Sequence, residues 1–225
     1  MSRKTTVLLV CTVALIVCEP LQSQADETTI ARVESSSANV DWSQWRGPNG
    51  DGISLESGWS TAWPDAGPEV LWKFDLGITD NKNGDSHVAV SGGRLYVMGI
   101  ERLYCLDAES GKEVWQIPFA QSHSTPTVEN GKVYVYGIDG KVACLDAGTG
   151  EAVWSKDLHE GQSRFARKVG AYGYAASPVL MGDLVLVTAR LDGGALIALD
   201  KNNGDIKWKA FHAGHEGYAL WSTPV

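Results

Sequence analysis

LDAESGKEVW (106–115), LDAGTGEAVW (145–154) and LDKNNGDIKW (199–208) are three copies of one ten-residue segment, and they decide the fold. In each copy, glycine follows the aspartate by four residues and tryptophan follows it by eight. The residues that form this pattern are Asp107, Gly111, Trp115, Asp146, Gly150, Trp154, Asp200, Gly204 and Trp208. Identical offsets in three places indicate an internal structural repeat.

The flanks of each copy repeat as well. A turn and an alternating apolar segment precede it: GGRLYVMG (92–99), NGKVYVYG (130–137) and GDLVLVTA (182–189). Still earlier in each unit stand STPTV (124–128), ASPVL (176–180) and STPV (222–225). Such alternation is typical of strands, and the Asn-Gly and Asp-Gly pairs are typical of hairpin turns. In the middle unit we expect strands at 125–128, 132–136, 142–145 and 152–156, which form one blade of a β-propeller.

Each residue of the pattern has a structural task in such a blade. The aspartate accepts hydrogen bonds from its own turn, and the glycine supplies a positive φ. The tryptophan covers the neighbouring blade. The sequence therefore predicts an all-β fold, a partial and open β-propeller of four-stranded antiparallel blades. We expect about three blades, an N-terminal strand and the start of a fourth blade, and we interpret residues 88–225 as truncated propeller repeats of a longer gene product.

Composition agrees with a globular β-protein. The 225 residues are 44% hydrophobic and include 25 glycines and 9 tryptophans, a profile that favours many short strands and turns. Lys plus Arg number 19 against 27 Asp plus Glu, a net charge of −8. Because this charge repels a phosphate backbone, we expect no nucleic-acid partner.

The N-terminal residues resemble an export signal. Arg3 and Lys4 precede an apolar run at 7–18, and SQA at 23–25 provides a cleavage site. A run of this length is too short for a spanning helix, which needs about 20 residues. We therefore expect a signal peptide at 1–25, a flexible polar leader at 26–40, export to the periplasm or cell envelope, and no stable membrane span after cleavage.

With these repeats the chain resembles the PQQ-like, or quinoprotein-like, family of β-propellers with tryptophan-docking motifs, and in particular its BamB-like exported bacterial members. The resemblance covers residues 88–225, and WSQWRGPNGDGIS (42–54) with GPEVLWKFDLG (67–77) is similar to the start of such proteins. It implies that residues 41–87 form an N-terminal segment whose closing strand carries Trp72. Pro64 and Pro68 stand where the aspartate and glycine of the pattern would be.

The resemblance implies two functions, because the family includes the BamB scaffold and PQQ-dependent alcohol dehydrogenases. Such an enzyme would carry adjacent cysteines and a Ca²⁺ site, yet this sequence has no Cys-Cys pair. Cys105, Cys144 and Ala198 occupy one repeat position, which favours a small buried site over a disulfide or a redox role. We predict a non-catalytic binding or scaffold module with no catalytic, cofactor-binding or metal residues. The alternative is a fragment of a PQQ- and Ca²⁺-dependent dehydrogenase.

Histidines and acidic loops offer weaker candidates. His212 and His215 lie in a glycine-containing segment that does not place both imidazoles on one face. The loop at 80–85 has lysine at the third ligand position of a Ca²⁺ loop, so a solvated turn is favoured. His87 and His123 precede the first strands of successive blades, where they either line the central channel or bond to loops.

The spacing of the repeats reveals an insertion. The first two copies are 39 residues apart and the next two 54, so 15 residues are added at about 159–174. This stretch combines basic and aromatic residues, namely Arg164, Phe165, Arg167, Lys168, Tyr172 and Tyr174. Because loops on rigid scaffolds often bind, we expect a protein partner or a small anionic or carbohydrate-like ligand on this face. The alternative is an ordinary solvated loop.

Overall fold

The computed structural model describes residues 41–58, 62–77, 87–120, 122–159, 174–191, 194–211 and 223–224. The chain divides into two units, 1–36 and 37–225, and every described residue belongs to the second. These residues form strands, turns and loops, and none of them belongs to a helix that could cross a membrane. The predicted signal peptide and leader lie outside the described residues and stay predictions.

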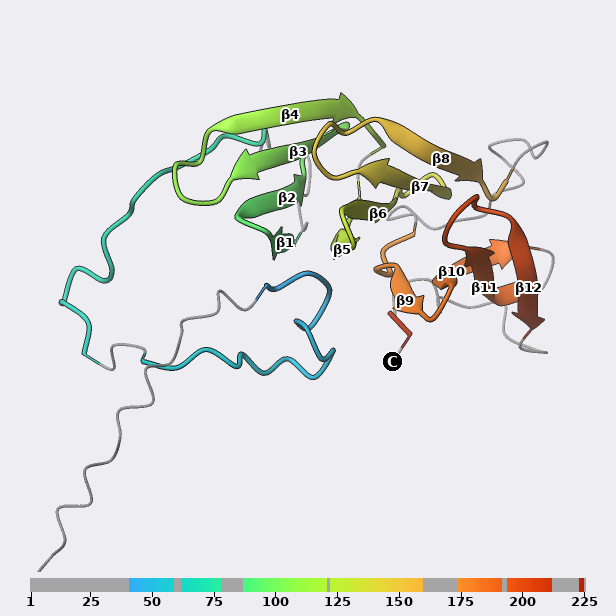
Figure 1. The fold of residues 1–225 in the computed structure, drawn as a ribbon, viewed down its shortest axis with the longest axis horizontal. Coiled ribbons are helices and arrows are strands. Elements are labelled where there is room, and N and C mark those ends of the chain that lie inside the picture. The colour runs from blue at the N-terminus through green and yellow to red at the C-terminus, as the bar shows by residue number, and fades with distance from the viewer. Residues whose placement is uncertain are drawn as a thin grey trace, which may run out of the picture. The chain divides into compact units, whose positions relative to one another are not determined.

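Within the described residues, twelve strands form three sheets, each from four consecutive strands paired antiparallel (Figure 1). The first sheet contains β1 (Val88–Ser91), β2 (Arg94–Met98), β3 (Arg102–Asp107) and β4 (Glu113–Pro118). The second contains β5 (Thr127–Glu129), β6 (Lys132–Tyr136), β7 (Lys141–Asp146) and β8 (Ala152–Asp157). The third contains β9 (Val179–Met181), β10 (Leu184–Leu191), β11 (Gly194–Asp200) and β12 (Ile206–Phe211). The predicted all-β, open propeller architecture is confirmed.

The strand bounds differ from expectation in one informative place. The first strand of the middle blade begins at Thr127 rather than at Thr125. The reason is that the Thr125 N–H does not enter the ladder but donates to the Ser177 hydroxyl, before the next sheet, at 2.9 Å. The other three strands of this blade lie within one residue of the predicted ends.

A register shift recurs at the same point of every blade. It falls between Cys105 and Leu106, between Cys144 and Leu145, and between Ala198 and Leu199. Directly before each shift, the residue pairs with the blade's tryptophan, as Cys105 does with Trp115. A small side chain opposite the indole leaves space for the ring, which explains why this repeat position holds cysteine or alanine.

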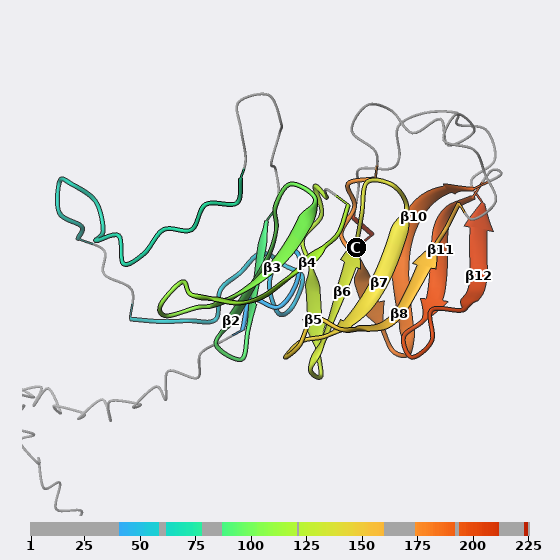
Figure 2. The ribbon, with the colours of Figure 1, turned by 90° about the horizontal axis from the view of Figure 1, so that it is seen from above.

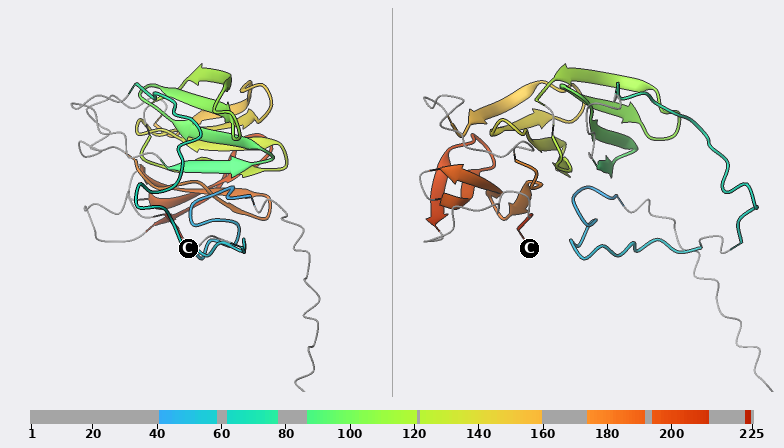
Figure 3. Two further views of the ribbon diagram at one scale, coloured as in Figure 1. Left: turned by 90° about the vertical axis from the view of Figure 1, so that its left-hand side faces the viewer. Right: turned by 180° about the vertical axis from the view of Figure 1, so that it is seen from behind.

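The core lies between consecutive sheets, which follow one another in chain order (Figures 2 and 3). One cluster joins the first and second sheets around Met98, Leu103 and Val133, and all three side chains are almost fully buried. A second cluster joins the second and third sheets around Tyr136 and Ile197. Among the described residues, consecutive sheets therefore bury apolar side chains against each other, as expected of stacked repeats.

Candidate functional site

An aspartate organises the turn between the third and fourth strands of each blade. The Asp107 carboxylate accepts a hydrogen bond from the Ser110 N–H at 2.9 Å, and Asp200 accepts one from the Asn202 N–H at 2.8 Å. The Ser110 hydroxyl and N–H lower the pKa of Asp107, and Lys207 beside Asp200 does the same there. These carboxylates are therefore engaged in their own turns.

At the first junction between blades, Trp115 of β4 reaches the turn of the second blade. Its indole N–H donates to the Ala147 carbonyl at 3.0 Å. Its ring covers Gly150, which has a φ of 76°. A Cβ atom at Gly150 would lie 2.8 Å from the Trp115 ring, so only glycine allows this approach. The tryptophan and the next blade's glycine therefore form one contact.

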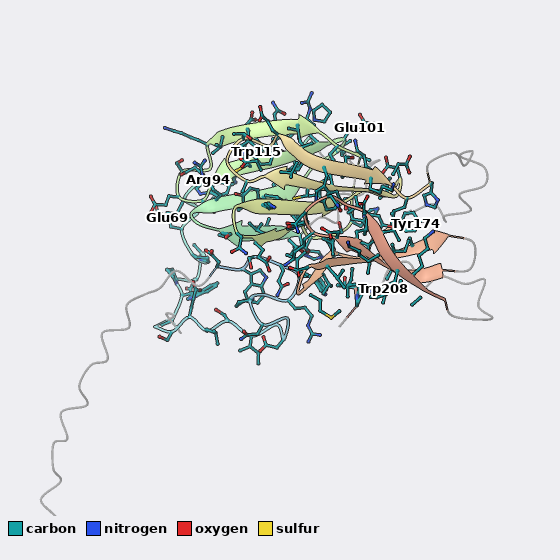
Figure 4. The ribbon with its side chains drawn as sticks, turned by 45° about the vertical axis from the view of Figure 1, so that its right-hand side comes forward. Glu69, Arg94, Glu101, Trp115, Tyr174 and Trp208 are labelled. Atoms are coloured by element: carbon teal, nitrogen blue, oxygen red, sulfur yellow. The ribbon has the colours of Figure 1, made fainter. Side chains whose placement is uncertain are left out.

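The second junction repeats the arrangement. The Trp154 indole N–H donates to the Lys201 carbonyl at 2.7 Å, and the ring covers Gly204, whose φ is 74°. Trp208, on β12 of the third blade, has 39% of its surface exposed, against 8% for Trp154. Figure 4 labels Trp115 and Trp208 on the first and third sheets.

Trp72 makes the same contact with the first blade. Its indole N–H donates to the Ala108 carbonyl at 3.2 Å, and a Cβ atom at Gly111 would lie 2.4 Å from the ring. Residues 71–77 nevertheless carry no assigned strand. Trp72 thus occupies the place of a preceding blade's tryptophan, and its membership of a closing strand stays a prediction.

The two described cysteines are buried in different sheets. Cys105 and Cys144 are free thiols with no exposed surface. Burial raises the pKa of both thiols, which disfavours the reactive thiolate. Cys105 lies opposite Tyr96 on the neighbouring strand, and Cys144 lies opposite Tyr134. These contacts agree with packing positions in the strands.

The ends of the insertion hold a buried polar cluster that the sequence analysis missed. Tyr174, expected to add aromatic surface, is fully buried, so that expectation is wrong. Its hydroxyl lies 2.5 Å from His159 Nε2, and its ring stacks on Tyr136 with centroids 5.3 Å apart. The His159 ring fits because Gly140 has no side chain: a Cβ there would lie 2.5 Å away. Figure 4 labels Tyr174.

The partner-binding candidates of the insertion lie outside the described residues: Arg164, Phe165, Arg167, Lys168 and Tyr172. His212 and His215 lie outside them as well. Within the ranges that the structure describes, no three His, Cys, Asp or Glu side chains gather as a metal site would require.

Hydroxyl groups before the first strands connect successive blades. The Ser177 hydroxyl accepts from the Thr125 N–H, and the Ser177 N–H donates in turn to the Thr223 hydroxyl at 3.0 Å. These three residues hold one position in the repeated small-residue and proline motif. The motif predicted where the first strands begin. The hydrogen bonds between blades were not predicted, because neither the apolar alternation nor the turn residues indicate them.

The N-terminal residues 41–52 lie against the first strands, and we call this segment the inner-edge strap. The Val90 N–H of β1 donates to the Trp42 carbonyl at 2.9 Å. The Val128 N–H of β5 donates to the next carbonyl, that of Ser43, at 2.8 Å. The strap thus bridges the first two blades. The sequence of this segment resembles the start of PQQ-like propeller proteins, but its contacts with β1 and β5 were not predicted.

The strap also accounts for the position of His87. The ring of His87 lies edge-on to Trp45, with centroids 5.0 Å apart. His87 is exposed, whereas His123 is half-buried. The two alternatives predicted for His87, lining the central channel or bonding to loops, both stay predictions.

Successive four-stranded antiparallel sheets joined through tryptophan contacts define a β-propeller architecture. The family model described as "Outer membrane protein assembly factor BamB" matches residues 58–217. The chain therefore belongs to this family of PQQ-like repeat propellers, as the repeat motifs predicted.

Two curated relatives carry enzyme names. The chain is 27% identical over 164 residues to the quinoprotein alcohol dehydrogenase PedH of Pseudomonas putida, over 66% of this chain and 26% of the relative. It is 28% identical over 168 residues to a quinoprotein ethanol dehydrogenase of Pseudomonas aeruginosa, over 65% of this chain and 26% of that protein. The chain thus spans about a quarter of the length of these relatives.

Two solved structures match part of the chain. BamB from Moraxella catarrhalis matches with a TM-score of 0.42 and 23% identity, over 53% of this chain and 34% of that one. Quinohemoprotein alcohol dehydrogenase from Comamonas testosteroni matches with a TM-score of 0.46 and 24% identity, over 55% of this chain and 20% of that one.

The described residues do not fit the cofactor set of a PQQ enzyme. Cys105 and Cys144 are buried in different sheets, so they cannot form the adjacent pair that the resemblance associates with that cofactor. The same part of the chain holds no carboxylate cluster for Ca²⁺. We therefore derive no chemical step through PQQ from these residues.

Proposed function

We propose that the protein is an exported, non-catalytic binding or scaffold module that presents loops on a rigid set of propeller blades. One observation carries this proposal: the repeated aspartates, glycines and tryptophans are engaged in contacts within turns and between blades. The functional groups that the repeats contribute therefore hold the scaffold together. The family description, an assembly factor, supports the same function.

The binding residues that we propose lie in the insertion. Its basic and aromatic members are Arg164, Phe165, Arg167, Lys168 and Tyr172. In a chain with a net charge of −8, this basic cluster favours an acidic partner. Both ends of the insertion are anchored by the buried contact between His159 and Tyr174, which suits a loop that must be held in place.

An array of acidic, neutral and basic peptides tests this proposal. We expect the full chain to retain acidic peptides, and the triple variant Arg164→Ser, Arg167→Ser, Lys168→Ser to lose at least tenfold in affinity. Lys112→Ser, Lys132→Ser and Lys156→Ser together form a matched control that removes equal charge from the first two blades, outside the insertion. Equal retention by the insertion variant would contradict the proposed site.

The second candidate is a PQQ-dependent oxidoreductase, favoured by the names of the two enzyme relatives. Adding PQQ and Ca²⁺ to the full-length protein and measuring alcohol-dependent dye reduction distinguishes the two functions. We expect no reduction above the rate without protein. Turnover that depends on PQQ, Ca²⁺ and alcohol together would establish the enzyme instead.

A further inference from the structure

We propose that the inner-edge strap is a binding site for an acidic carbohydrate, in which Arg46 contacts the carboxylate and Trp45 beside His87 contacts the sugar ring. This site is separate from the insertion and does not depend on the function proposed for it.

The strap is fixed to the blades before any ligand arrives. Besides its two backbone bonds to β1 and β5, its Asp41 carboxylate accepts from the Ser91 hydroxyl at 2.8 Å and from the Gly92 N–H at 3.0 Å. A group held by four hydrogen bonds to two blades loses little freedom when a ligand binds. Such preorganisation favours affinity.

The strap is also folded upon itself. The Gly47 N–H donates to the Gln44 carbonyl at 3.0 Å, and the Gln44 amide donates to the Pro48 carbonyl at 3.1 Å. The Trp42 ring lies so close to Gly47 that a Cβ atom there would be 2.7 Å from it. The Trp42 ring is therefore the indole that packs against the strap's own turn.

Arg46 adopts a backbone conformation that its residue type disfavours. Its φ is 64°, in the left-handed region where glycine and asparagine are the usual residues. Among the described residues, the other non-glycine positions with positive φ are Glu101 and Asn130, and both lie in hairpin turns between paired strands. Arg46 is the third residue of the four-residue turn closed by the Gly47 N–H and the Gln44 carbonyl, a place where a positive φ favours glycine or asparagine. Unfavourable backbone conformations cluster at functional sites, and Arg46 combines one with an exposed positive charge.

The guanidinium of Arg46 is available to a ligand. Within the described ranges its hydrogen bond goes to the Asp51 carbonyl at 3.3 Å, and the residue is exposed. The strap's two carboxylates are engaged elsewhere, because Asp41 binds β1 and Asp51 Oδ1 accepts from the Ile53 N–H at 2.9 Å. Arginine donors arranged in a fork match a carboxylate in a bidentate manner.

The neighbouring aromatic pair indicates the rest of the ligand. Trp45 has 37% of its surface exposed, and its ring is held edge-on by His87 at 60°. An exposed indole face offers an apolar platform to a ring. A uronic acid residue combines a ring with an apolar face, hydroxyl groups and a carboxylate. It therefore suits Trp45 and Arg46, which are adjacent in the chain and both exposed.

Calorimetry with the full chain and a trimer of galacturonic acid tests the site, with a trimer of galactose as the neutral control. We expect binding of the acidic trimer that weakens as salt is added, and at least tenfold weaker binding of the neutral trimer. Trp45→Ala should lower the affinity for the acidic trimer at least tenfold. Trp63→Ala, at a more exposed indole outside the strap, is the matched control and should leave the affinity unchanged.

Arg46→Asn separates binding from folding. Asparagine tolerates a positive φ, so we expect a melting temperature no lower than that of the natural sequence, together with at least tenfold loss of affinity. Wild-type affinity in this variant, equal binding of both trimers, or no heat signal at 10-fold molar excess and millimolar concentration would overturn the proposal. None of these results affects the peptide experiment on the insertion.

Discussion

Trp154 and Trp208 stand at the same position of two repeats, yet their surroundings differ. Trp154 covers Gly204 of the following blade and is 8% exposed. Trp208 is 39% exposed, and its Asp200 turn is used by Trp154 rather than by its own indole. The ten-residue motif therefore takes part in two different contacts. Its turn receives the tryptophan of the preceding blade, and its own tryptophan reaches the turn of the following blade.

This comparison shows that the burial of a repeat's tryptophan depends on the neighbouring blade. The tryptophan at this repeat position is buried where the glycine of a following turn faces it, as for Trp154. It is partly exposed where the described residues supply no such turn, as for Trp208. Trp72 shows the same on the N-terminal side of the first blade, because its ring covers Gly111 although Trp72 belongs to no assigned strand. What matters is the pairing of a ring with a glycine.

The largest expected effect separates the two tryptophans directly. Trp154→Ala removes a buried ring and its hydrogen bond to Lys201, and should lower the free energy of unfolding by about 3–5 kcal/mol. Trp208→Ala removes a ring that is already partly hydrated and should cost about 1 kcal/mol. Urea denaturation of both variants measures the difference. Equal losses would contradict the assignment of Trp154 as the docked ring.

The glycine half of the contact should show the next largest effect. In Gly150→Ala, the new methyl group adds left-handed strain and collides with Trp115, so we expect a loss of about 2–4 kcal/mol. Gly182 is the matched control, because its φ is 56° and nothing lies within 4 Å of a Cβ there. Gly182→Ala should cost about 1 kcal/mol from strain alone. Thermal or urea unfolding compares the two, and a similar loss for both would mean that the indole yields.

The repeat made the blades predictable because each of its residues acts through local chemistry or through the adjacent unit. Fixed offsets of aspartate, glycine and tryptophan specified the turn, the close approach and the covering ring. Runs of β-branched and aromatic residues such as Val133, Tyr134 and Val135, all buried, specified the strand between them. The strand order within each sheet then followed from short hairpin turns.

Contacts without a repeat could not be predicted in this way. His159 and Tyr174 are separated by the insertion, and no periodicity relates them, so Tyr174 was expected at the surface although it is buried. The strap presented the same difficulty, because Trp42 and Ser43 bind strands far along the chain through backbone carbonyls. Because every residue type has a backbone carbonyl, the sequence does not indicate which carbonyl accepts such a hydrogen bond.

Acid should weaken the turns that carry shifted carboxylates. The pKa values of Asp107 and Asp200 lie below their ordinary 3.8, so the folded state holds fewer protons than the unfolded state near that pH. Their contribution to stability is full above about pH 5 and is lost as pH falls through the folded-state values. Asp107→Asn with Asp200→Asn should flatten this decline in denaturation series from pH 6 to pH 2. An unchanged slope would show that other groups govern it.

The smallest expected effect concerns the side chain at the docking carbonyl. Lys201 supplies the carbonyl that Trp154 binds, and its ammonium lies 2.5 Å from Glu129; Ala108 and Ala147 hold the equivalent position in the other two blades. Lys201→Ala keeps the carbonyl and removes the ion pair, so we expect a loss of about 0.5–1 kcal/mol that shrinks as salt is added. Urea denaturation at two salt concentrations measures this. A loss as large as that of Trp154→Ala would mean that the ion pair, rather than the indole, holds the second and third blades together.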